Sequence, residues 1–364
     1  MYDVGILTFW GVPNYGTFAQ AYALQRTVQK LRPDLDVRQI AYLNPTHYDF
    51  YFSKWPKCGV RNRAFLPTLL QNLKKDSVQN QRKAIFEEGY RTIPHTPQLN
   101  AKGLKKTKFG VVILGSDIVW DYSIPVFGDD PFLFGNGLLA DKVISYAASF
   151  GTVKPGQEAP KFVKSGIRGL QHIAVRDENS AEIVKELSGQ MPAVVLDPVW
   201  MWDFSTDENV VLPAYQDYMV VYGQDFTEGF IEQTIRFAKE KNLKTICLDC
   251  NEDSYTWCDV LIKQQDLSVY EWLGLFKGAQ AVSTSTFHGL TFGLVFEKPL
   301  AFCRTDFIMA KAGSFLKKLG LYDLYENNND VKKMLEYQRD IQATRTVIEE
   351  MRRESEDYLA KALV

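Results

Sequence analysis

His288 follows a run of hydroxyl-bearing residues at a place where an ionisable side chain can do chemistry. The run continues an apolar, strand-like segment and consists of Ser283, Thr284, Ser285 and Thr286, with Gly289 just after the histidine. An imidazole titrates near neutral pH, so it can give a proton to a carbon atom or take one from a hydroxyl. Hydroxyls and backbone N–H groups at the start of a helix bind an anion, cap the helix, or do both. We expect an anion site around His288, although a histidine that is only hydrogen-bonded in the protein wall would look the same in the sequence.

A second group of candidate residues follows the apolar segment 109–114. Gly115 and Ser116 lead there to Asp117. A glycine lets the backbone approach a ligand closely, and the carboxylate either acts as a base toward a hydroxyl or only caps the next turn. Three further residues, at the junction of the first expected strand and helix, are predicted to line the same cleft: Asn14, Tyr15 and Gly16.

The elements that must position these residues alternate between short apolar strands and longer amphipathic helices. This alternation is typical of βα units that build a parallel sheet, and such sheets bind ligands at the carboxyl ends of their strands. Strands are expected at residues 4–8, 109–114, 142–146, 172–175, 193–196, 218–222, 244–248 and 280–283. Helices are expected from about residue 17, at 229–241, at 268–277 and within 331–362.

The length and composition predict two globular domains. The chain has 364 residues, of which 46% are hydrophobic and 24% charged, the balance of a folded protein. Its net charge of −2 gives no general attraction to nucleic acid or an acidic membrane, so a phosphate-bearing ligand needs a local cluster of cations. The sequence shows no basic leader and no apolar run of about 20 residues, which predicts a soluble, cytoplasmic protein without a transmembrane segment.

The cysteines give no strong sign of a disulfide framework or a metal. Cys247 and Cys250 have the C-x-x-C spacing, but no second ligand pair or nearby histidine completes a tetrahedral set. We expect reduced, buried thiols, and neither a metal nor a cofactor.

Residues 44–100 differ in character from the rest of the first half. An aromatic group is followed by a basic, glutamine-rich stretch that contains Arg82 and Lys83. We interpret the region as an insertion that either packs as a satellite of the core or lines an acceptor site. The aromatic group comprises Tyr48, Phe50, Tyr51, Phe52 and Trp55.

Four segments between residue 1 and about residue 320 together resemble the polysaccharide pyruvyl transferases in order and spacing. They are Asn14-Tyr15-Gly16, Gly115-Ser116-Asp117, Val175-Arg176-Asp177 ahead of Leu196-Asp197-Pro198, and Thr286-Phe287-His288-Gly289. The resemblance implies an α/β fold of two Rossmann-like domains facing each other across a cleft, similar to the GT-B glycosyltransferases. It also implies transfer of pyruvate from phosphoenolpyruvate to sugar hydroxyls as a ketal, in cell-surface polysaccharide biosynthesis.

The resemblance further implies roles for single residues. His288 matches the family's conserved histidine, and Arg176 matches an arginine that faces the donor, the alternative being a surface pair with Asp177 or Glu178. A second donor-binding cation matches Lys311, with Arg304 as the competing choice. Ser285 and Thr286 stand where a serine and often an acidic residue are usual, which leaves open any role carried over from that carboxylate.

The expected domains are residues 1–205, with the insertion, residues 216–330, with the donor site, and residues 331–364, helices that pack back on the first domain. The implied partners are phosphoenolpyruvate and a sugar or lipid-linked oligosaccharide, which would bring the enzyme to the inner face of the cell membrane without an anchor. Two other functions remain open. One is a nucleotide-sugar-dependent glycosyltransferase of GT-B type, whose ribose-binding glutamate and glycine-rich loop are not evident. The other is a non-catalytic saccharide-binding relative.

Overall fold

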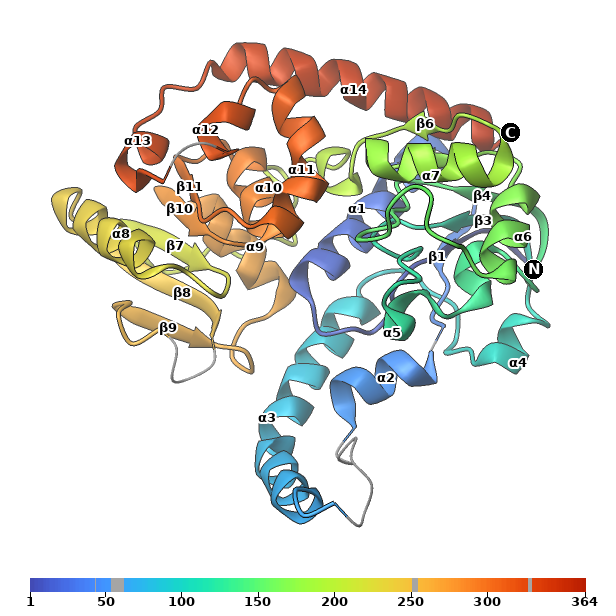
Figure 1. Ribbon diagram of the computed structural model, residues 1–364, viewed down its shortest axis with the longest axis horizontal. Helices are drawn as coiled ribbons and strands as arrows, with labels where there is room; N and C mark the ends of the chain where they lie inside the picture. The colour runs from blue at the N-terminus through green and yellow to red at the C-terminus, as the bar shows by residue number, and fades with distance from the viewer. Residues whose placement is uncertain (43, 54–61, 251–254, 327–328) are drawn as a thin grey trace. The chain divides into compact units, whose positions relative to one another are not determined.

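The chain folds into two compact α/β units (Figure 1). The computed structural model describes residues 1–42, 44–53, 62–250, 255–326 and 329–364. Unit 1 consists of Met1–Val175, Asn179–Ala193 and Leu363, and unit 2 of Arg176–Glu178, Val194–Ala362 and Val364. The chain passes from unit 1 to unit 2 between residues 193 and 194, ahead of the boundary at residue 205 that the sequence predicts.

Unit 1 is built on a parallel sheet of four strands in the order β2-β1-β3-β4. The two central strands, β1 and β3, are largely apolar and bury Val4, Ile6 and Ile113 completely. The elements of this unit, in chain order, are β1 (Tyr2–Leu7), α1 (Tyr15–Leu31), β2 (Val37–Gln39), α2 (Pro45–Phe52), α3 (Phe65–Arg91), α4 (Ala101–Leu104), β3 (Lys108–Leu114), α5 (Pro125–Gly128), η1 (Pro131–Phe134), β4 (Leu139–Ser145), α6 (Lys161–Gly169), β5 (Ala174–Val175), α7 (Glu178–Ser188) and β6 (Ala193–Val194).

Helix α1 begins two residues earlier than the sequence predicts. The side chain of Asn14 accepts a hydrogen bond from the Thr17 backbone N–H at 3.0 Å and so caps the helix. Most of the residues in its first three turns are buried, as expected for a helix packed on a sheet.

The region 44–100 carries helices α2 and α3, and α3 is 27 residues long. Lys83 of α3 lies over the ring of Tyr48 in α2, with 4.9 Å between the ammonium nitrogen and the ring centre, so the aromatic group and the basic stretch of the sequence meet in space. Trp55 of the same aromatic group lies outside the described residues.

Unit 2 is built on a parallel sheet of five strands in the order β11-β10-β7-β8-β9. Helix α8 contacts β8, α10 contacts β10 and β11, and α13 contacts β11. The elements are η2 (Pro198–Trp200), β7 (Tyr218–Tyr222), α8 (Glu228–Glu240), β8 (Lys244–Cys250), β9 (Val260–Lys263), α9 (Val269–Gly278), β10 (Ala281–Thr284), α10 (Phe287–Val295), β11 (Leu300–Phe302), α11 (Asp306–Lys318), α12 (Tyr322–Glu326), α13 (Val331–Leu335) and α14 (Ile341–Ala362).

The predicted α/β class with parallel sheets is confirmed in both units. The expected strands at 172–175 and 193–196 are shorter than predicted, because only β5 and β6, of two residues each, pair as strands there. Strand β9, which has only four residues, was not predicted. The C-terminal stretch forms α13 and α14 in unit 2, while Leu363 belongs to unit 1, where its carbonyl accepts a hydrogen bond from Arg32 at 3.0 Å.

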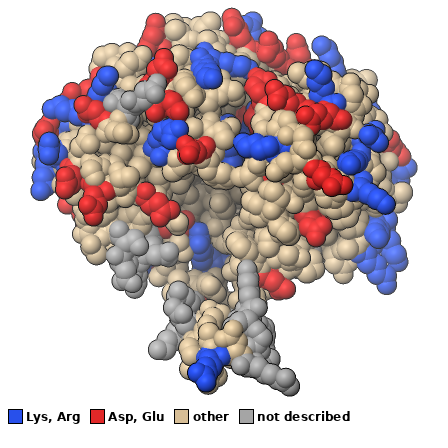
Figure 2. Space-filling view, viewed as in Figure 1, with Lys and Arg blue, Asp and Glu red and all other residues tan. Residues whose placement is uncertain are grey.

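Basic and acidic side chains are interspersed over the face shown in Figure 2, in keeping with the small net charge. In the part of the chain that is described, no helix is both long enough and apolar enough to cross a membrane. Cys247 and Cys303 are buried, as the sequence predicts, Cys258 is half-buried, and Cys58 lies outside the described residues.

Candidate functional site

The order of strands in unit 2 creates a switch point between β7 and β10. From β7 the chain adds β8 and β9 on one side of the sheet, then returns to place β10 and β11 on the other side. Loops that leave neighbouring parallel strands in opposite directions open a crevice at the carboxyl ends of those strands, which is where open α/β sheets bind ligands. The loops after β7 and β10 both reach this edge of the sheet.

These two loops are locked together by hydrogen bonds. The Ser285 hydroxyl donates to the Gln224 carbonyl at 2.6 Å and accepts from the Gln224 backbone N–H at 2.9 Å. Glycine is required at position 223 in the loop after β7, where φ is 146°, because a Cβ atom there would collide with the Ser285 side chain. The loop after β10 is therefore held rigidly at the switch point.

Helix α10 starts at this edge and carries His288 in its first turn. The Thr286 side chain caps the helix by accepting a hydrogen bond from the Gly289 backbone N–H at 2.9 Å. The ring of His288 is half-buried and meets the ring of Phe287 edge-on, with 5.1 Å between centres. The predicted helix start and the predicted cap are thus both present.

Ser283 and Thr284, the first two members of the hydroxyl run, both lie within β10 and are fully buried. The Ser283 hydroxyl is 3.3 Å from that of Thr234 on α8, and the Thr284 hydroxyl donates to the Tyr222 carbonyl at 2.6 Å. The prediction that Ser283 binds substrate is therefore wrong, because alternate residues of a strand point to opposite faces and this one points into the packed interior.

Arg176 forms a buried ion pair with Asp197. Its Nη1 atom is 2.8 Å from the Asp197 Oδ2 atom, and the two side chains are only 5% and 3% exposed. The guanidinium carbon lies 5.0 Å from the centre of the Phe287 ring, the residue next to His288. Arg176 was expected to belong to the first domain and to have Asp177 or Glu178 as its alternative partner; it belongs instead to unit 2 and pairs with Asp197.

Lys311 and Arg304, the two candidates for a second cation, have different surroundings. Lys311 lines a narrow pocket that Arg176, Asp197 and Phe287 also line, with a volume of about 40 Å³, room for about three water molecules. Arg304 is held by Glu326 at 2.8 and 3.0 Å and by Asp306 at 2.8 Å. The hydrogen bonds that Arg304 donates to Glu326, and then those to Asp306, raise the pKa of Arg304 above its ordinary value. Of the two, Lys311 is the one that shares a pocket with Arg176.

Asp117 lies at the carboxyl end of β3 in unit 1, with a left-handed backbone φ of 79°. Its carboxylate accepts hydrogen bonds from the Thr17 hydroxyl at 3.0 Å and from the Ile118 backbone N–H at 2.8 Å. Burial first, and then the charge of Asp117, raise the pKa of Tyr51 to about 12. A carboxylate, a hydroxyl and a phenol from three separate segments are thus brought together at the edge where β1 and β3 end.

The other candidates of unit 1 serve the structure around Asp117. Ser116 is fully buried, and its hydroxyl donates to the Gln20 side chain. Tyr15 is 1% exposed and packs against Phe86 with 4.8 Å between ring centres. Gly16 is buried in α1, and Gly115 supports a close approach of backbone to Tyr146. Tyr15 and Gly16, predicted to line a cleft, and Ser116, a predicted substrate-binding residue, are thus buried in unit 1, whereas Asn14 is exposed but caps α1.

Sequence reasoning missed three neighbours of the predicted residues. The sequence alone assigns no role to Asp197 or Phe287, and it places Tyr51 only within a group of aromatic residues. The Arg176–Asp197 pairing spans helix α7 and strand β6. A signal was present, since both residues lie in conspicuous polar motifs at strand ends.

The arrangement in unit 2 can hold a small anion and move a proton. A guanidinium oriented by a buried carboxylate donates two or more directed hydrogen bonds to a carboxylate or phosphate, and a lysine adds a point charge. An imidazole on the adjacent residue can transfer a proton. Among the described residues, His, Cys, Asp and Glu side chains do not gather in groups of three or more that could hold a metal ion.

Solved structures similar over the whole chain are distant in sequence. UDP-GlcNAc 2-epimerase from Methanocaldococcus jannaschii shares 12% identity with a TM-score of 0.49, covering 95% of this chain and 98% of that one. A putative UDP-N-acetylglucosamine 2-epimerase from Listeria monocytogenes shares 9% sequence identity with a TM-score of 0.49, covering 99% of this chain and 90% of that one. The glycosyltransferase SnogD from Streptomyces nogalater shares 10% sequence identity with a TM-score of 0.41, covering 100% of this chain and 98% of that one. Comparison with curated proteins gives no match.

The family assignment comes from the sequence itself. The model of the family described as polysaccharide pyruvyl transferase matches residues 14–306, which include Asp117, Arg176, Asp197 and His288. This stretch covers most of both α/β units, including the switch point of unit 2. The chain belongs to the polysaccharide pyruvyl transferase family.

Proposed function

We propose that this protein transfers the pyruvyl group of phosphoenolpyruvate onto two hydroxyls of one sugar, forming a ketal. The observation that carries the proposal is that Arg176 and Lys311 line one pocket with Phe287, whose ring contacts that of His288. At about 40 Å³ the pocket has room for one anionic group of the donor, and the rest of the donor would lie outside it. Phosphoenolpyruvate carries a carboxylate and a phosphate, so two fixed cations suit it. Family membership supports a transferase that acts on a sugar.

In this proposal Asp197 positions Arg176. An arginine held at 2.8 Å by a buried carboxylate cannot swing to other partners, so its remaining N–H groups have a fixed direction. Lys311 contacts the donor as the second cation and balances the charge of the departing phosphate. The loop held by Ser285 and Gln224 then presents the start of α10 toward the donor.

The proposed chemistry begins with a proton from His288 to the methylene carbon of the donor. That step turns the methylene into a methyl group and leaves an oxocarbenium-like centre at C2. One sugar hydroxyl attacks C2, the bond between C2 and the phosphate oxygen breaks, and the second hydroxyl closes the ketal. Two hydroxyl protons are released: one replaces the proton given by His288 and the other leaves with phosphate. No electrons are exchanged with an external group, so we propose a reaction without a cofactor.

For Asp117 we propose contact with the acceptor sugar. Its carboxylate accepts from Thr17 and lies close enough to Tyr51 to raise the pKa of that phenol, a polar set suited to hydroxyl groups. The acceptor would be a sugar or lipid-linked oligosaccharide of cell-surface polysaccharide synthesis, met in the cytoplasm at the inner face of the membrane.

The test is incubation of the purified full-length protein with phosphoenolpyruvate and a panel of sugars. We expect release of inorganic phosphate that depends on one acceptor, together with a product methyl signal by NMR. A thermal-shift comparison with nucleotide sugars separates the glycosyltransferase alternative, because only a true donor should stabilise the fold. Absence of phosphate release with every acceptor, together with absence of phosphoenolpyruvate binding by calorimetry, would overturn the proposal.

A further inference from the structure

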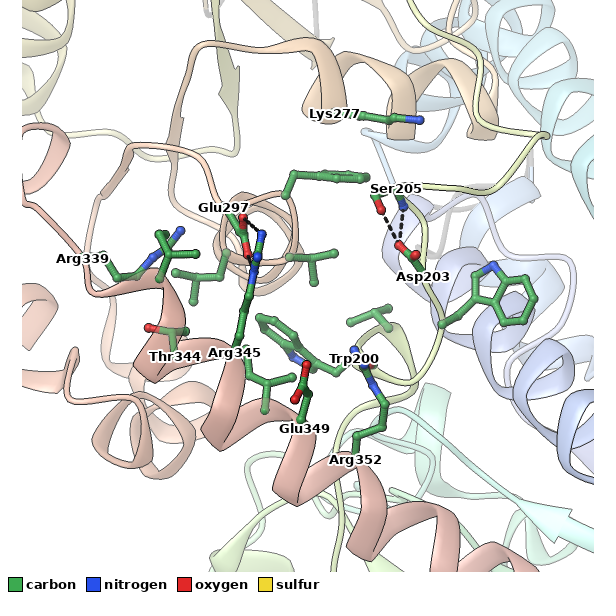
Figure 3. A pocket seen from close by; sticks show the side chains of 17 residues that line it. Trp200, Asp203, Ser205, Lys277, Glu297, Arg339, Thr344, Arg345, Glu349 and Arg352 are labelled. Carbon is green, nitrogen blue, oxygen red and sulfur yellow. Dashed lines mark hydrogen bonds and ion pairs between the residues drawn. The ribbon is translucent and has the colours of Figure 1, made fainter.

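Unit 2 contains a second and larger pocket, distinct from the proposed donor site (Figure 3). It has a volume of about 410 Å³ and lies against the C-terminal end of α10, where Leu294 and Glu297 contribute to its wall. The proposed donor site lies at the other end of the same helix. Since α10 has nine residues, the two ends are about 13 Å apart. The volume falls within the range of small-molecule sites.

The pocket is lined by four basic and three acidic side chains. The basic ones are Lys277, Arg339, Arg345 and Arg352, and the acidic ones are Asp203, Glu297 and Glu349. Arg345 and Glu297 neutralise each other through two contacts of 2.5 and 2.7 Å. Lys277, Arg339 and Arg352 have no carboxylate partner within ion-pair distance among the described residues. The lining therefore keeps an excess of positive charge for a ligand.

Arg339 gives independent support for an anionic ligand. Its Nε atom is shielded from solvent and has no hydrogen-bond partner in the described part of the chain. Burial also lowers the pKa of this guanidinium below its ordinary value. The charge of Glu297 offsets only part of this effect of burial. A partly buried guanidinium whose Nε lacks a hydrogen-bond acceptor is unfavourable, and a bound anion would relieve that cost.

Arg352 is held in place at the opposite wall. Its Nε atom donates to the Trp200 carbonyl at 2.9 Å, which ties the side chain from α14 to η2. Figure 3 shows Arg352 and Glu349 projecting from α14 toward Trp200, and Arg345 reaching from the same helix to Glu297. One nitrogen is used by the backbone, so the rest of the guanidinium fork is oriented rather than mobile.

The remaining lining suits a ligand that also carries hydroxyls and an apolar ring face. Asp203 is fixed by the Ser205 hydroxyl at 2.5 Å and the Thr206 hydroxyl at 2.9 Å, and it and Glu349 supply carboxylate oxygens that accept hydrogen bonds. The Trp200 ring is a flat apolar wall against which the C–H face of a sugar can pack. We propose that this pocket binds a small phosphorylated saccharide, with Arg339 on the phosphate at one wall and Arg352, Asp203 and Glu349 on the sugar hydroxyls at the opposite wall.

The test is isothermal titration of the full-length protein with a hexose 6-phosphate, the free hexose and inorganic phosphate. We expect the hexose phosphate to bind more tightly than either of the other two. Arg339→Gln and Arg352→Gln should each weaken that binding about tenfold or more, since each removes a charge-assisted hydrogen bond. Arg353→Gln is the matched control, because Arg353 is exposed on the same helix and outside the pocket lining; its affinity should be unchanged.

Two further binding measurements distinguish a ligand in this pocket from one in the proposed donor site. Hexose phosphate binding should be the same in His288→Asn and in the presence of saturating phosphoenolpyruvate, whatever the outcome for pyruvyl transfer. Displacement by phosphoenolpyruvate, or equal affinity of all variants, would overturn the proposal. Equal affinity for inorganic phosphate and hexose phosphate would overturn the assignment of a saccharide. Should Arg352→Gln fail to fold by circular dichroism, Arg339→Gln decides, because the Nε atom of Arg339 has no hydrogen-bond partner among the described residues that the substitution would remove.

Discussion

The guanidinium of Arg176 and the carboxylate of Asp197 meet at 2.8 Å with both side chains almost completely buried. Asp197 also accepts a hydrogen bond from the Val199 backbone N–H at 3.1 Å, which caps η2. One carboxylate therefore fixes both a short helix and the position of an arginine beside Phe287. A buried charge is stable only with its partner, because each compensates for the water that the other has lost. Removal of either side chain should therefore lower both the free energy of unfolding and the affinity for the donor.

Asp197→Ala is expected to lower the free energy of unfolding by about 3–5 kcal/mol, because it leaves Arg176 buried and unpaired. Urea denaturation followed by circular dichroism measures the change. The control is Asp141→Ala, which breaks an exposed ion pair with Lys108 and should not change stability measurably. Equal effects of the two substitutions would contradict the prediction.

His288→Asn is expected to lower kcat for phosphate release by a factor of about 10² to 10⁴, the usual contribution of a general acid. The thermal midpoint should change little, because the side chain is only half-buried and asparagine is polar and smaller. The control is His172→Asn, an exposed position of unit 1. Retention of full kcat by His288→Asn would exclude the imidazole from the chemical step.

Lys311→Ala is expected to raise KM for phosphoenolpyruvate about tenfold or more, because it removes one cation from the pocket that Arg176 lines. Arg304→Ala is the matched comparison: its guanidinium already has Glu326 and Asp306 as partners, so KM should stay the same. Steady-state kinetics with a fixed acceptor measures both. The opposite ranking would make Arg304 the donor-binding residue.

Stability should fall in acid through His47, which is 6% exposed between Phe9 and Phe127. Burial lowers the pKa of His47 from 6.5 to about 4. Between pH 6.5 and pH 4 the unfolded chain binds a proton at His47 that the folded chain does not. The contribution of His47 to the free energy of unfolding is therefore complete above pH 6.5 and is lost as the pH falls toward 4. The difference amounts to about 3 kcal/mol of unfolding free energy.

His47→Phe should remove that part of the acid sensitivity, and urea denaturation at about pH 7 and about pH 5 measures it. His95→Phe serves as the control, since His95 is only partly buried in the same unit. If the wild type and His47→Phe lose stability in parallel between the two pH values, the prediction is wrong.

The strands that the sequence predicted best are those buried on both faces. Strand β7 has the expected bounds, and β3 differs by one residue. A strand covered on both faces of a parallel sheet is a continuous apolar run, which is easily found in a sequence. Strand β9 escaped prediction because its four residues, Val260–Lys263, are too short a run to show a period. Strands β5 and β6 have two residues each in a sheet of two strands, and Val175 of β5 makes only an isolated bridge to Ala148.

At the candidate site, the sequence alone determined the residue types and their places at strand ends: Asp117 after β3, Arg176 after β5 and His288 at the start of α10. Those places follow from local patterns of polarity and capping, which act over a few residues. Only the tertiary structure decided that Arg176 pairs with Asp197, that Lys311 rather than Arg304 joins it, and that Ser283 and Tyr15 face the core. These outcomes depend on which segments, tens of residues apart, are packed together, and no local pattern encodes that choice.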